Sequence, residues 1–167
     1  RSADGRTDVM TYMTPVLTQP MRVSGAPIAD LYAKTTGTDG DFVVKIIDVL
    51  PPNVADAKMG GYQLPISLDI FRGRYRDSFS KPSAIPAGKV QRYRFRLPTV
   101  NHVFQPGHRV MVQVQSSLFP LYDRNPQTYV KNIFFAQPGD YRKATVTIAR
   151  GGTQASAVLL PIVPVAN

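Results

Sequence analysis

The sequence predicts an all-β domain, a sandwich of short strands, on three observations. Roughly eight to ten short apolar segments recur between turn signals, at the spacing typical of sandwiches. No stretch shows the apolar spacing of an amphipathic helix of normal length. The 167 residues include 15 prolines and 12 glycines, which are many for helices and natural for strands joined by turns. We expect one domain, residues 1–167, long enough for its own core.

Composition excludes several kinds of site. The chain has no cysteine, so disulfides, thiolate zinc sites and cysteine nucleophiles are ruled out. No apolar run approaches the roughly 20 residues of a membrane helix, and we expect no membrane partner. The net charge of +9 has two interpretations: the first is a nucleic-acid or acidic partner, and the second is a plain basic surface, or a surface that normally faces the rest of a larger protein. We favour the second interpretation, because net charge speaks to solubility and steering rather than to a site.

In the first part of the chain, prolines and glycines separate the expected strands. Pro15 ends the first strand, and Gly25-Ala26-Pro27 divides the next two. A turn with two glycines at residues 35–41 precedes a nearly continuous apolar run, which favours a central strand covered on both faces. The expected strands are residues 9–14 (an edge strand), 21–25, 27–34 and 42–50, with one helical turn at residues 54–58.

Two strands rich in arginine are expected at residues 66–76 and 89–97. On the second, Tyr93 and Phe95 alternate with the arginines, so the rings are expected in the core and the arginines outside. A single-stranded nucleic-acid platform needs rings and cations on the same exposed face, so no nucleic-acid partner is predicted. The arginines are Arg72, Arg74 and Arg76 on the first strand and Arg92, Arg94 and Arg96 on the second.

The cleanest strand pattern covers residues 108–117. Val110, Val112 and Val114 alternate with polar residues and Met111, as on a strand with one buried face. Further strands are expected at residues 101–104, 130–136, 143–149 and 156–163, with a hairpin turn at Gly151-Gly152 between the last two.

Residues 119–128 form an irregular segment, because Pro120 and Pro126 both lack the donor that a sheet requires. The segment contains Phe119, Leu121 and Tyr122 and is too apolar for an idle surface loop, so we expect an ordered loop packed under or between other elements. Its polar core can hold such a loop: Asp123 and Asn125 can satisfy backbone donors, and Arg124 can bind carbonyls or a carboxylate. Direct contact with a ligand is the alternative role for these three residues.

The sequence offers little chemistry. It has no Gly-x-Ser-x-Gly elbow and no phosphate-binding glycine loop before a helix. His102 and His108 flank one turn and could act as general bases, but neither has a visible Ser or Asp companion, and a structural role is favoured. Asp39 and Asp41 could supply calcium ligands, although turn chemistry explains both. No cofactor and no metal are predicted.

A carbohydrate-binding module is the main alternative function. Sandwich domains often bind glycans on an exposed aromatic ring, and this chain has no tryptophan but eight tyrosines. A stand-alone glycan-binding sandwich therefore stays open as a function.

Four blocks of the chain resemble the C-terminal domain of the X-Pro dipeptidyl-peptidase and cocaine-esterase hydrolases. These blocks are residues 38–49, 71–76, 107–117 and 119–128. Residues 59–63 and the run Leu-Tyr-Asp-Arg-Asn-Pro-Gln-Thr at 121–128 look most like the α-amino acid ester hydrolases and glutaryl-cephalosporin acylases. The resemblance implies a jelly-roll β-sandwich that is similar to galactose-binding domains.

The resemblance also implies a non-catalytic role. The serine triad of the family lies in a separate α/β-hydrolase domain, and none of its residues maps onto this sequence. The expected partner is that domain of the same parent chain, an esterase, acylase or dipeptidyl-peptidase of bacterial origin, with homo-oligomer contacts also expected. The location of the parent, periplasmic or secreted against cytoplasmic, stays open. The expected loop and interface residues are Phe119, Leu121, Tyr122, Asp123, Arg124, Asn125, Arg72, Arg74 and Arg76.

Overall fold

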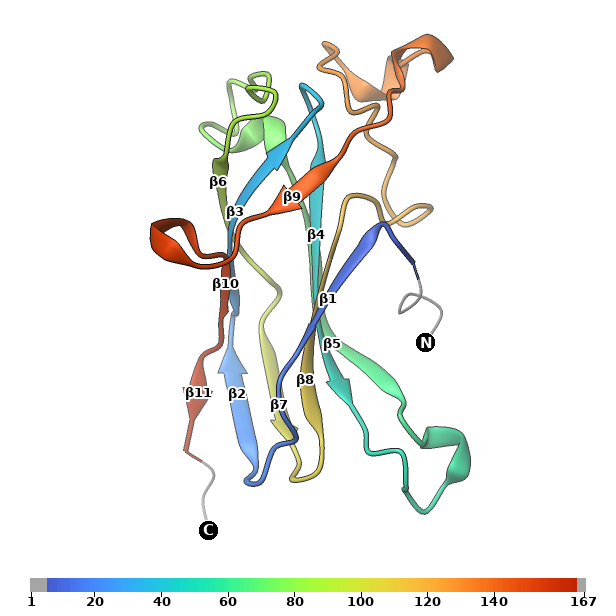
Figure 1. The fold of residues 1–167 in the computed structure, drawn as a ribbon, viewed down its shortest axis with the longest axis vertical. Helices are drawn as coiled ribbons and strands as arrows, with labels where there is room; N and C mark the ends of the chain where they lie inside the picture. Colours follow the sequence, from blue (N-terminus) through green and yellow to red (C-terminus); the bar gives the residue numbers. More distant parts are fainter. Residues whose placement is uncertain (1–5, 165–167) are drawn as a thin grey trace.

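The computed structural model describes residues 6–164 and confirms the all-β prediction. Within that range it contains strands and short 3-10 turns and no α-helix (Figure 1). The strands are β1 (Val9–Met13), β2 (Met21–Gly25), β3 (Ile28–Thr35), β4 (Asp41–Val49), β5 (Gln63–Arg72), β6 (Gln91–Arg96), β7 (Val100–Phe104), β8 (Arg109–Gln115), β9 (Val146–Ile148), β10 (Ala157–Leu159) and β11 (Ile162–Val163). The 3-10 turns are η1 (Ala57–Met59), η2 (Gly73–Tyr75), η3 (Ile133–Phe135), η4 (Pro138–Asp140) and η5 (Gly152–Gln154).

One layer of the sandwich is an antiparallel sheet in the order β1-β8-β4-β5. The apolar strand β4 lies in its interior, paired with β5 on one side and β8 on the other, as the continuous apolar run predicts. Strand β1 pairs only with β8 and forms the edge, which confirms the edge prediction for residues 9–14.

The other layer is a three-stranded sheet interrupted along one line. Its upper half has the order β10-β3-β6 and its lower half the order β11-β2-β7, so each chain segment continues from one half into the other. Each crossing carries a proline, namely Pro27, Pro98 and Pro161. Because proline lacks the amide donor, three prolines at the same level interrupt the ladder together. The Leu97 and Ser24 amides donate to the Pro27 and Pro161 carbonyls and hold the halves in line.

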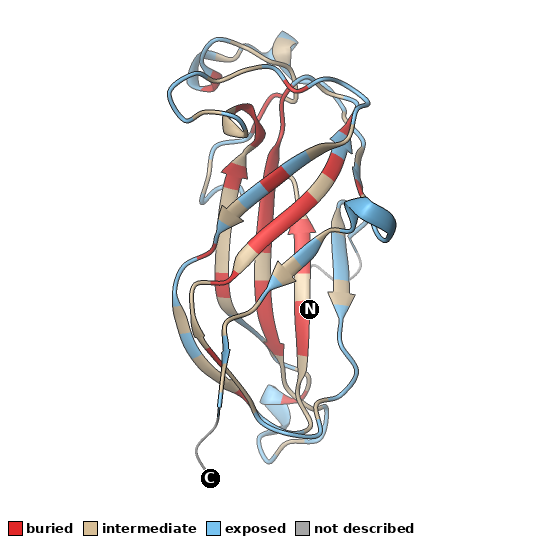
Figure 2. Ribbon diagram, turned by 90° about the vertical axis from the view of Figure 1, so that its left-hand side faces the viewer, coloured by how far each residue is buried: buried red, intermediate tan, exposed pale blue. Residues whose placement is uncertain are grey.

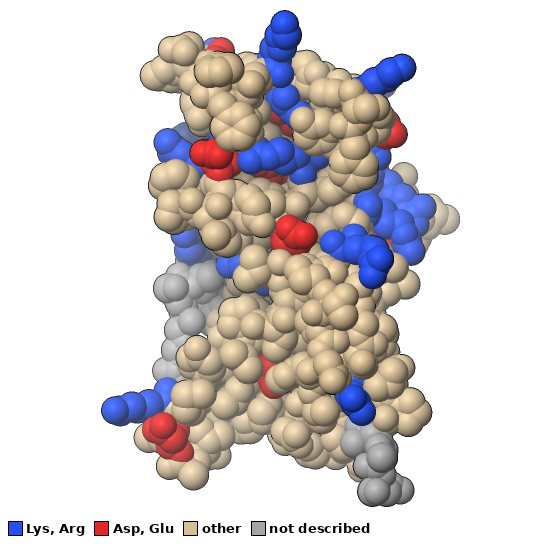
Figure 3. Space-filling model, turned by 180° about the vertical axis from the view of Figure 1, so that it is seen from behind, with Lys and Arg blue, Asp and Glu red and all other residues tan. Residues whose placement is uncertain are grey.

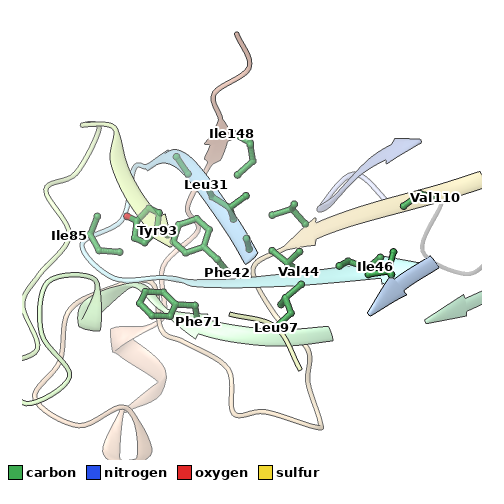
Figure 4. Packing of buried hydrophobic residues seen from close by; sticks show 14 of the residues in the cluster. Leu31, Phe42, Val44, Ile46, Phe71, Ile85, Tyr93, Leu97, Val110 and Ile148 are labelled. Carbon is green, nitrogen blue, oxygen red and sulfur yellow. The ribbon is translucent and has the colours of Figure 1, made fainter. Parts of the chain in front are cut away.

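The core lies between the two layers, and Figure 2 shows the buried residues strung along the strands with exposed residues at the loops. In Figure 4 the rings of Phe42 on β4 and Tyr93 on β6 face each other, with centroids 4.0 Å apart. Ile85, from the loop between β5 and β6, covers Tyr93, while Val44 and Ile46 continue the row along β4. The alternation on β6 is thus as predicted: Tyr93 is fully buried while Arg92, Arg94 and Arg96 are exposed.

Four strand predictions are wrong. Residues 156–163 form two strands, β10 and β11, with Pro161 between them, instead of one strand. Strand β5 ends at Arg72, and residues 73–75 turn away as η2 instead of continuing to Arg76. Residues 133–135 form η3 instead of a strand. Gly151-Gly152 does not make a hairpin, because β9 and β10 both pair antiparallel with β3 and run in the same direction along one edge. Loop 149–156 is therefore an excursion from one edge rather than a reversal.

Strand β8 departs from the predicted single buried face. Val110 and Val114 face the core, but Met111 and Gln113 on the opposite face are also buried, with 1% and 2% exposure. The alternation of valines located the strand correctly and did not reveal that both of its faces are covered.

Irregular segments gather at the upper end of the molecule. The loop after β5, residues 73–90, and the long segment between β8 and β9, residues 116–145, both rise there in Figure 1. Within residues 6–164 no helix is long and apolar enough to cross a membrane.

Candidate interdomain surface

The long segment after β8 carries a group of bare apolar side chains at its turns. Phe119 is 63% exposed, Leu121 68%, Phe134 68% and Phe135 76%. We call these four residues the aromatic tip. The predicted burial of the loop is therefore wrong for Phe119 and Leu121, because no other layer of the described chain covers that part of the segment. Large apolar side chains that stay in water on an ordered loop indicate a surface that meets a partner.

The loop is nevertheless held firmly, and Asn125 is its first anchor. Asn125 is buried, and its amide nitrogen donates to Asp41 Oδ1 at 2.9 Å while its amide oxygen accepts from the Gln127 backbone N–H. Arg72 donates to the other oxygen of Asp41 at 3.1 Å. This confirms the predicted backbone-satisfying role of Asn125. Burial raises the pKa of the Asp41 carboxyl to about 6, against the opposing pull of Arg72.

Arg74 is the second anchor. Its side chain is 4% exposed and forms an ion pair with the fully buried Asp39, with Nε donating to Oδ2 at 2.9 Å. The same guanidinium donates to the Val130 carbonyl and lies over the Tyr129 ring, 4.7 Å from its centroid. One buried arginine thus ties the 35–41 turn to the far arm of the loop. The carboxylates of Asp39 and Asp41, considered as calcium ligands, are both engaged by guanidinium groups.

Gly37 lets the backbone of the loop approach the turn. A Cβ at this position would lie 2.3 Å from the Gln127 carbonyl oxygen, a distance that real side chains do not reach. Gln127 itself takes a positive φ of 63°. Its carbonyl accepts from the Thr38 amide at 3.1 Å and from the Asp39 amide at 3.4 Å, so the loop bonds directly to the turn.

Arg76, the third arginine of this segment, also binds backbone groups of this chain. Its guanidinium donates to the carbonyls of Gly73, Ser83 and Ala84, which closes the 77–84 loop onto η2. Arg72, Arg74 and Arg76 therefore do not form a row on one strand face, as a strand over residues 66–76 would have placed them. They are internal ties of the upper loops.

The remaining predicted loop residues lie nearer the surface. Asp123 and Arg124 are exposed, and Tyr122 is half-buried with its backbone amide bonded to the Leu118 carbonyl. The Arg124 guanidinium lies 5.4 Å from the ring centroid of Phe119 and 5.6 Å from that of Tyr141. It therefore binds aromatic faces, a cation–π arrangement, rather than the carbonyl or carboxylate that we expected.

At the lower end, the two histidines do have an acidic companion, which the sequence did not reveal. Asp48 is buried at the end of β4. One of its carboxylate oxygens forms a hydrogen bond with His102 Nε2 and the other with His108 Nδ1, both at 2.8 Å. Because His102 lies on β7 of the opposite layer, this bridge ties the two layers together. Among the described residues, no group of three or more His, Cys, Asp or Glu side chains is arranged so that it could hold a metal ion.

Charge on the rear face is uneven. Figure 3 shows Lys and Arg side chains gathered over the upper half of that face and few of them below. The upper end thus carries irregular loops and much of the basic surface of this face. Such a surface suits attachment to another protein body.

A protein-family model and several known proteins match this chain. Residues 2–159 match the family model described as the X-Pro dipeptidyl-peptidase C-terminal non-catalytic domain. The cocaine esterase of Rhodococcus sp. (strain MB1 Bresler) is 38% identical over 163 residues, which cover 98% of this chain and 27% of that protein.

Two solved structures are similar over almost the whole chain. An α-amino acid ester hydrolase shares 60% identity with a TM-score of 0.95, covering 97% of this chain and 26% of that one. An aminopeptidase from a marine sediment archaeon, Thaumarchaeota archaeon, shares 53% identity with a TM-score of 0.96, covering 98% and 27%. The chain therefore spans about a quarter of the length of these relatives. It belongs to the family of non-catalytic C-terminal domains of X-Pro dipeptidyl-peptidase and cocaine-esterase-type hydrolases.

Proposed function

We propose that this domain packs through the aromatic tip against the catalytic α/β-hydrolase domain of its parent chain and helps to wall the substrate cleft. The parent is a serine hydrolase that forms an acyl-enzyme from an ester or amide, with α-amino acid esters and amino-terminal peptide bonds as the substrate class. The names of the α-amino acid ester hydrolase and the archaeal aminopeptidase support that class. The family match favours this function over the stand-alone glycan-binding module. Homo-oligomer contacts stay a prediction.

The observation that carries the proposal is an ordered loop with large apolar side chains exposed at its turns. Four large side chains that are at least 63% exposed lie on a segment that two buried polar anchors hold in place. A surface already ordered before association loses little conformational freedom on binding, which favours a stable interface. Arg124 extends the tip by stacking between Phe119 and Tyr141. Tyr122 and Asp123 lie beside it in sequence and form the rim of the proposed contact.

The test compares two variants of the full-length parent enzyme. In the first, Phe134 and Phe135 are both changed to serine. In the second, Ile162, which is 60% exposed on β11, is changed to serine as a control for the loss of exposed apolar surface away from the tip. We expect the first variant to lose at least about tenfold in kcat/KM for an α-amino acid ester, because two buried aromatic contacts are each worth about 1 kcal/mol or more.

The control variant should keep the activity of the wild type. Thermal unfolding of the first variant should also separate into two transitions, since the two domains would no longer stabilise each other. Equal activity and one shared transition in both variants would show that the tip faces solvent in the parent and would overturn the proposal.

A further inference from the structure

We infer that the open side of the sandwich between β5 and β6 binds a free aromatic α-amino acid. The two layers part there around a hollow of about 560 Å³. Its lining combines three aromatic rings with charges of both signs: Phe71, Phe79 and Phe95 with Asp69, Arg94 and Arg96. This site is separate from the aromatic tip and does not depend on the function proposed above.

The three rings of the lining are in contact through Phe71. Phe71 on β5 and Phe95 on β6 stack across the gap between the layers, with centroids 5.1 Å apart and planes 13° apart. Phe79, from the loop after η2, meets Phe71 edge to face at 6.2 Å and stacks on Tyr75 at 6.4 Å. Phe79 is nevertheless 81% exposed, the largest value among the large apolar side chains of the described chain. It is held in place by other rings and still offers an aromatic surface to a ligand.

The guanidinium groups on the rim come from β6. Arg94 donates to Asp30 on the neighbouring strand, which fixes the direction of its side chain while most of its donors stay free. Arg96, two residues further on, is exposed, and among residues 6–164 no ion pair or hydrogen bond of its side chain is observed. Two neighbouring guanidinium groups with free N–H donors can bind one carboxylate.

The opposite rim carries one carboxylate. Asp69 on β5 lies on the same side of its strand as Phe71, two residues away, and accepts a hydrogen bond from the Ile70 backbone N–H at 2.7 Å. Within the described residues it pairs with no cation. An ammonium group is therefore the natural complement of Asp69, just as a carboxylate is for Arg96.

A zwitterion with an aromatic side chain matches all of these features together. Its ammonium group meets Asp69, its carboxylate meets Arg96 and Arg94, and its ring lies against Phe79. A neutral sugar would leave the charges unused, and a nucleic-acid strand would place phosphates beside Asp69. The charges of both signs around rings thus specify an amino acid rather than a polyanion or a glycan.

The experiment titrates the 167-residue chain with L-phenylalanine and follows amide shifts by NMR. We expect saturable shifts of the Phe79, Phe95 and Arg96 amides, with a dissociation constant on the order of 1 mM for so small and exposed a ligand. Three probes each lack one feature: 3-phenylpropionate has no ammonium group, phenethylamine has no carboxylate, and L-alanine has no ring. Each should bind about threefold or more weakly than L-phenylalanine, because each exposed contact contributes modestly.

Variants assign each contact to a residue. Phe79→Ala should weaken L-phenylalanine about fivefold and leave L-alanine unchanged, since only the aromatic ligand uses that ring. Asp69→Asn should remove the preference for L-phenylalanine over 3-phenylpropionate, and Arg96→Gln the preference over phenethylamine. Arg150→Gln alters an exposed charge elsewhere and should change nothing. Absence of saturable shifts, or equal binding of L-phenylalanine and the three probes, overturns the inference.

Discussion

Two segments of this chain carry arginine at every second position, and they differ in how far their arginines are buried. Residues 72–76 read Arg-Gly-Arg-Tyr-Arg and residues 92–96 read Arg-Tyr-Arg-Phe-Arg. The middle arginine of the first, Arg74, is 4% exposed in its side chain, whereas the middle arginine of the second, Arg94, is 44% exposed. The same spacing thus gives an internal tie in one place and a solvent-facing row in the other.

The residues between the arginines decide the outcome. Tyr93 packs against Phe42 in the core, so the second segment has to remain a strand with its arginines outside. Gly73 has no side chain to bury, and its amide bonds to the Gly40 carbonyl at 2.8 Å as the chain turns into η2. The turn carries Arg74 inward, where the buried Asp39 meets it. Alternation of charge therefore predicts an exposed row only where apolar residues hold the strand.

The comparison predicts its largest effect for the buried pair. Arg74→Ala leaves Asp39 fully buried without its partner, and we expect the free energy of unfolding to fall by about 3–5 kcal/mol. Arg94→Ala removes a half-exposed partner of Asp30, which keeps Arg92, and should cost less than about 1 kcal/mol. Urea unfolding of both variants measures the difference. Equal losses would contradict the distinction between the two segments.

A pH titration tests the carboxyl that Arg72 holds. The folded chain raises the pKa of Asp41 to about 6 from an ordinary value of 3.8, so it retains a proton there that the unfolded chain releases. The contribution of Asp41 to stability is therefore fully present below about pH 4 and is lost as the pH rises through about 6, a change of about 3 kcal/mol. Asp41→Asn lacks this titration but keeps an acceptor for Asn125.

The measurement for Asp41 is urea unfolding of both proteins between about pH 4 and about pH 7. The unfolding free energy of the wild type minus that of the variant should decline over this window. A difference that stays constant with pH would show that burial does not control this carboxyl.

A smaller effect is expected at the glycine that makes the turn. A Cβ at Gly73 would lie 2.7 Å from Ile85 Cδ1 and 2.8 Å from the Gly40 carbonyl oxygen, so Gly73→Ala should cost about 1–3 kcal/mol. Gly139→Ala is the matched control, because a Cβ added at Gly139 would meet no other atom within 4 Å, and it should change stability by about 0.5 kcal/mol or less. Thermal unfolding of both variants suffices. A tolerated alanine at position 73 would mean that the tight turn does not separate the two segments.

The smallest expected effect concerns the second segment. The Tyr93 hydroxyl is buried, and among residues 6–164 it has no hydrogen-bond partner. Removal of an unsatisfied buried hydroxyl should be neutral or stabilising by about 1 kcal/mol, so Tyr93→Phe should raise the melting temperature slightly. A marked loss of stability would show that the hydroxyl, rather than the ring, holds β6 in place.

Much of the fold could be predicted from alternation and prolines. The apolar run at residues 42–50 located the interior strand, and Gly25-Ala26-Pro27 located the break between β2 and β3. The predictions failed for residues whose environment depends on partners far away in the sequence. No residue near Arg74 in the sequence predicts its contact with Asp39. Likewise, no residue near His102 predicts its contact with Asp48, which is 54 residues away.

The candidate surface was only half accessible to sequence reasoning. The prolines and the polar core of residues 119–128 correctly predicted an ordered irregular loop, and Asn125 holds it as expected. The apolar residues suggested burial inside this chain, because a sequence cannot distinguish a side chain that packs internally from one that awaits another domain. Phe134 and Phe135 escaped notice for a related reason, since an apolar pattern at residues 130–136 resembles a strand.

Hydrogen exchange tests the central claim most directly, by comparing the 167-residue chain alone with the same residues inside the full-length parent enzyme. If the aromatic tip packs on the catalytic domain, amides of residues 117–122 and 132–136 should exchange at least about tenfold more slowly in the parent. Amides of residues 157–163, at the opposite end, should exchange alike in both. Equal exchange at the tip in the two proteins would contradict the proposed interdomain contact.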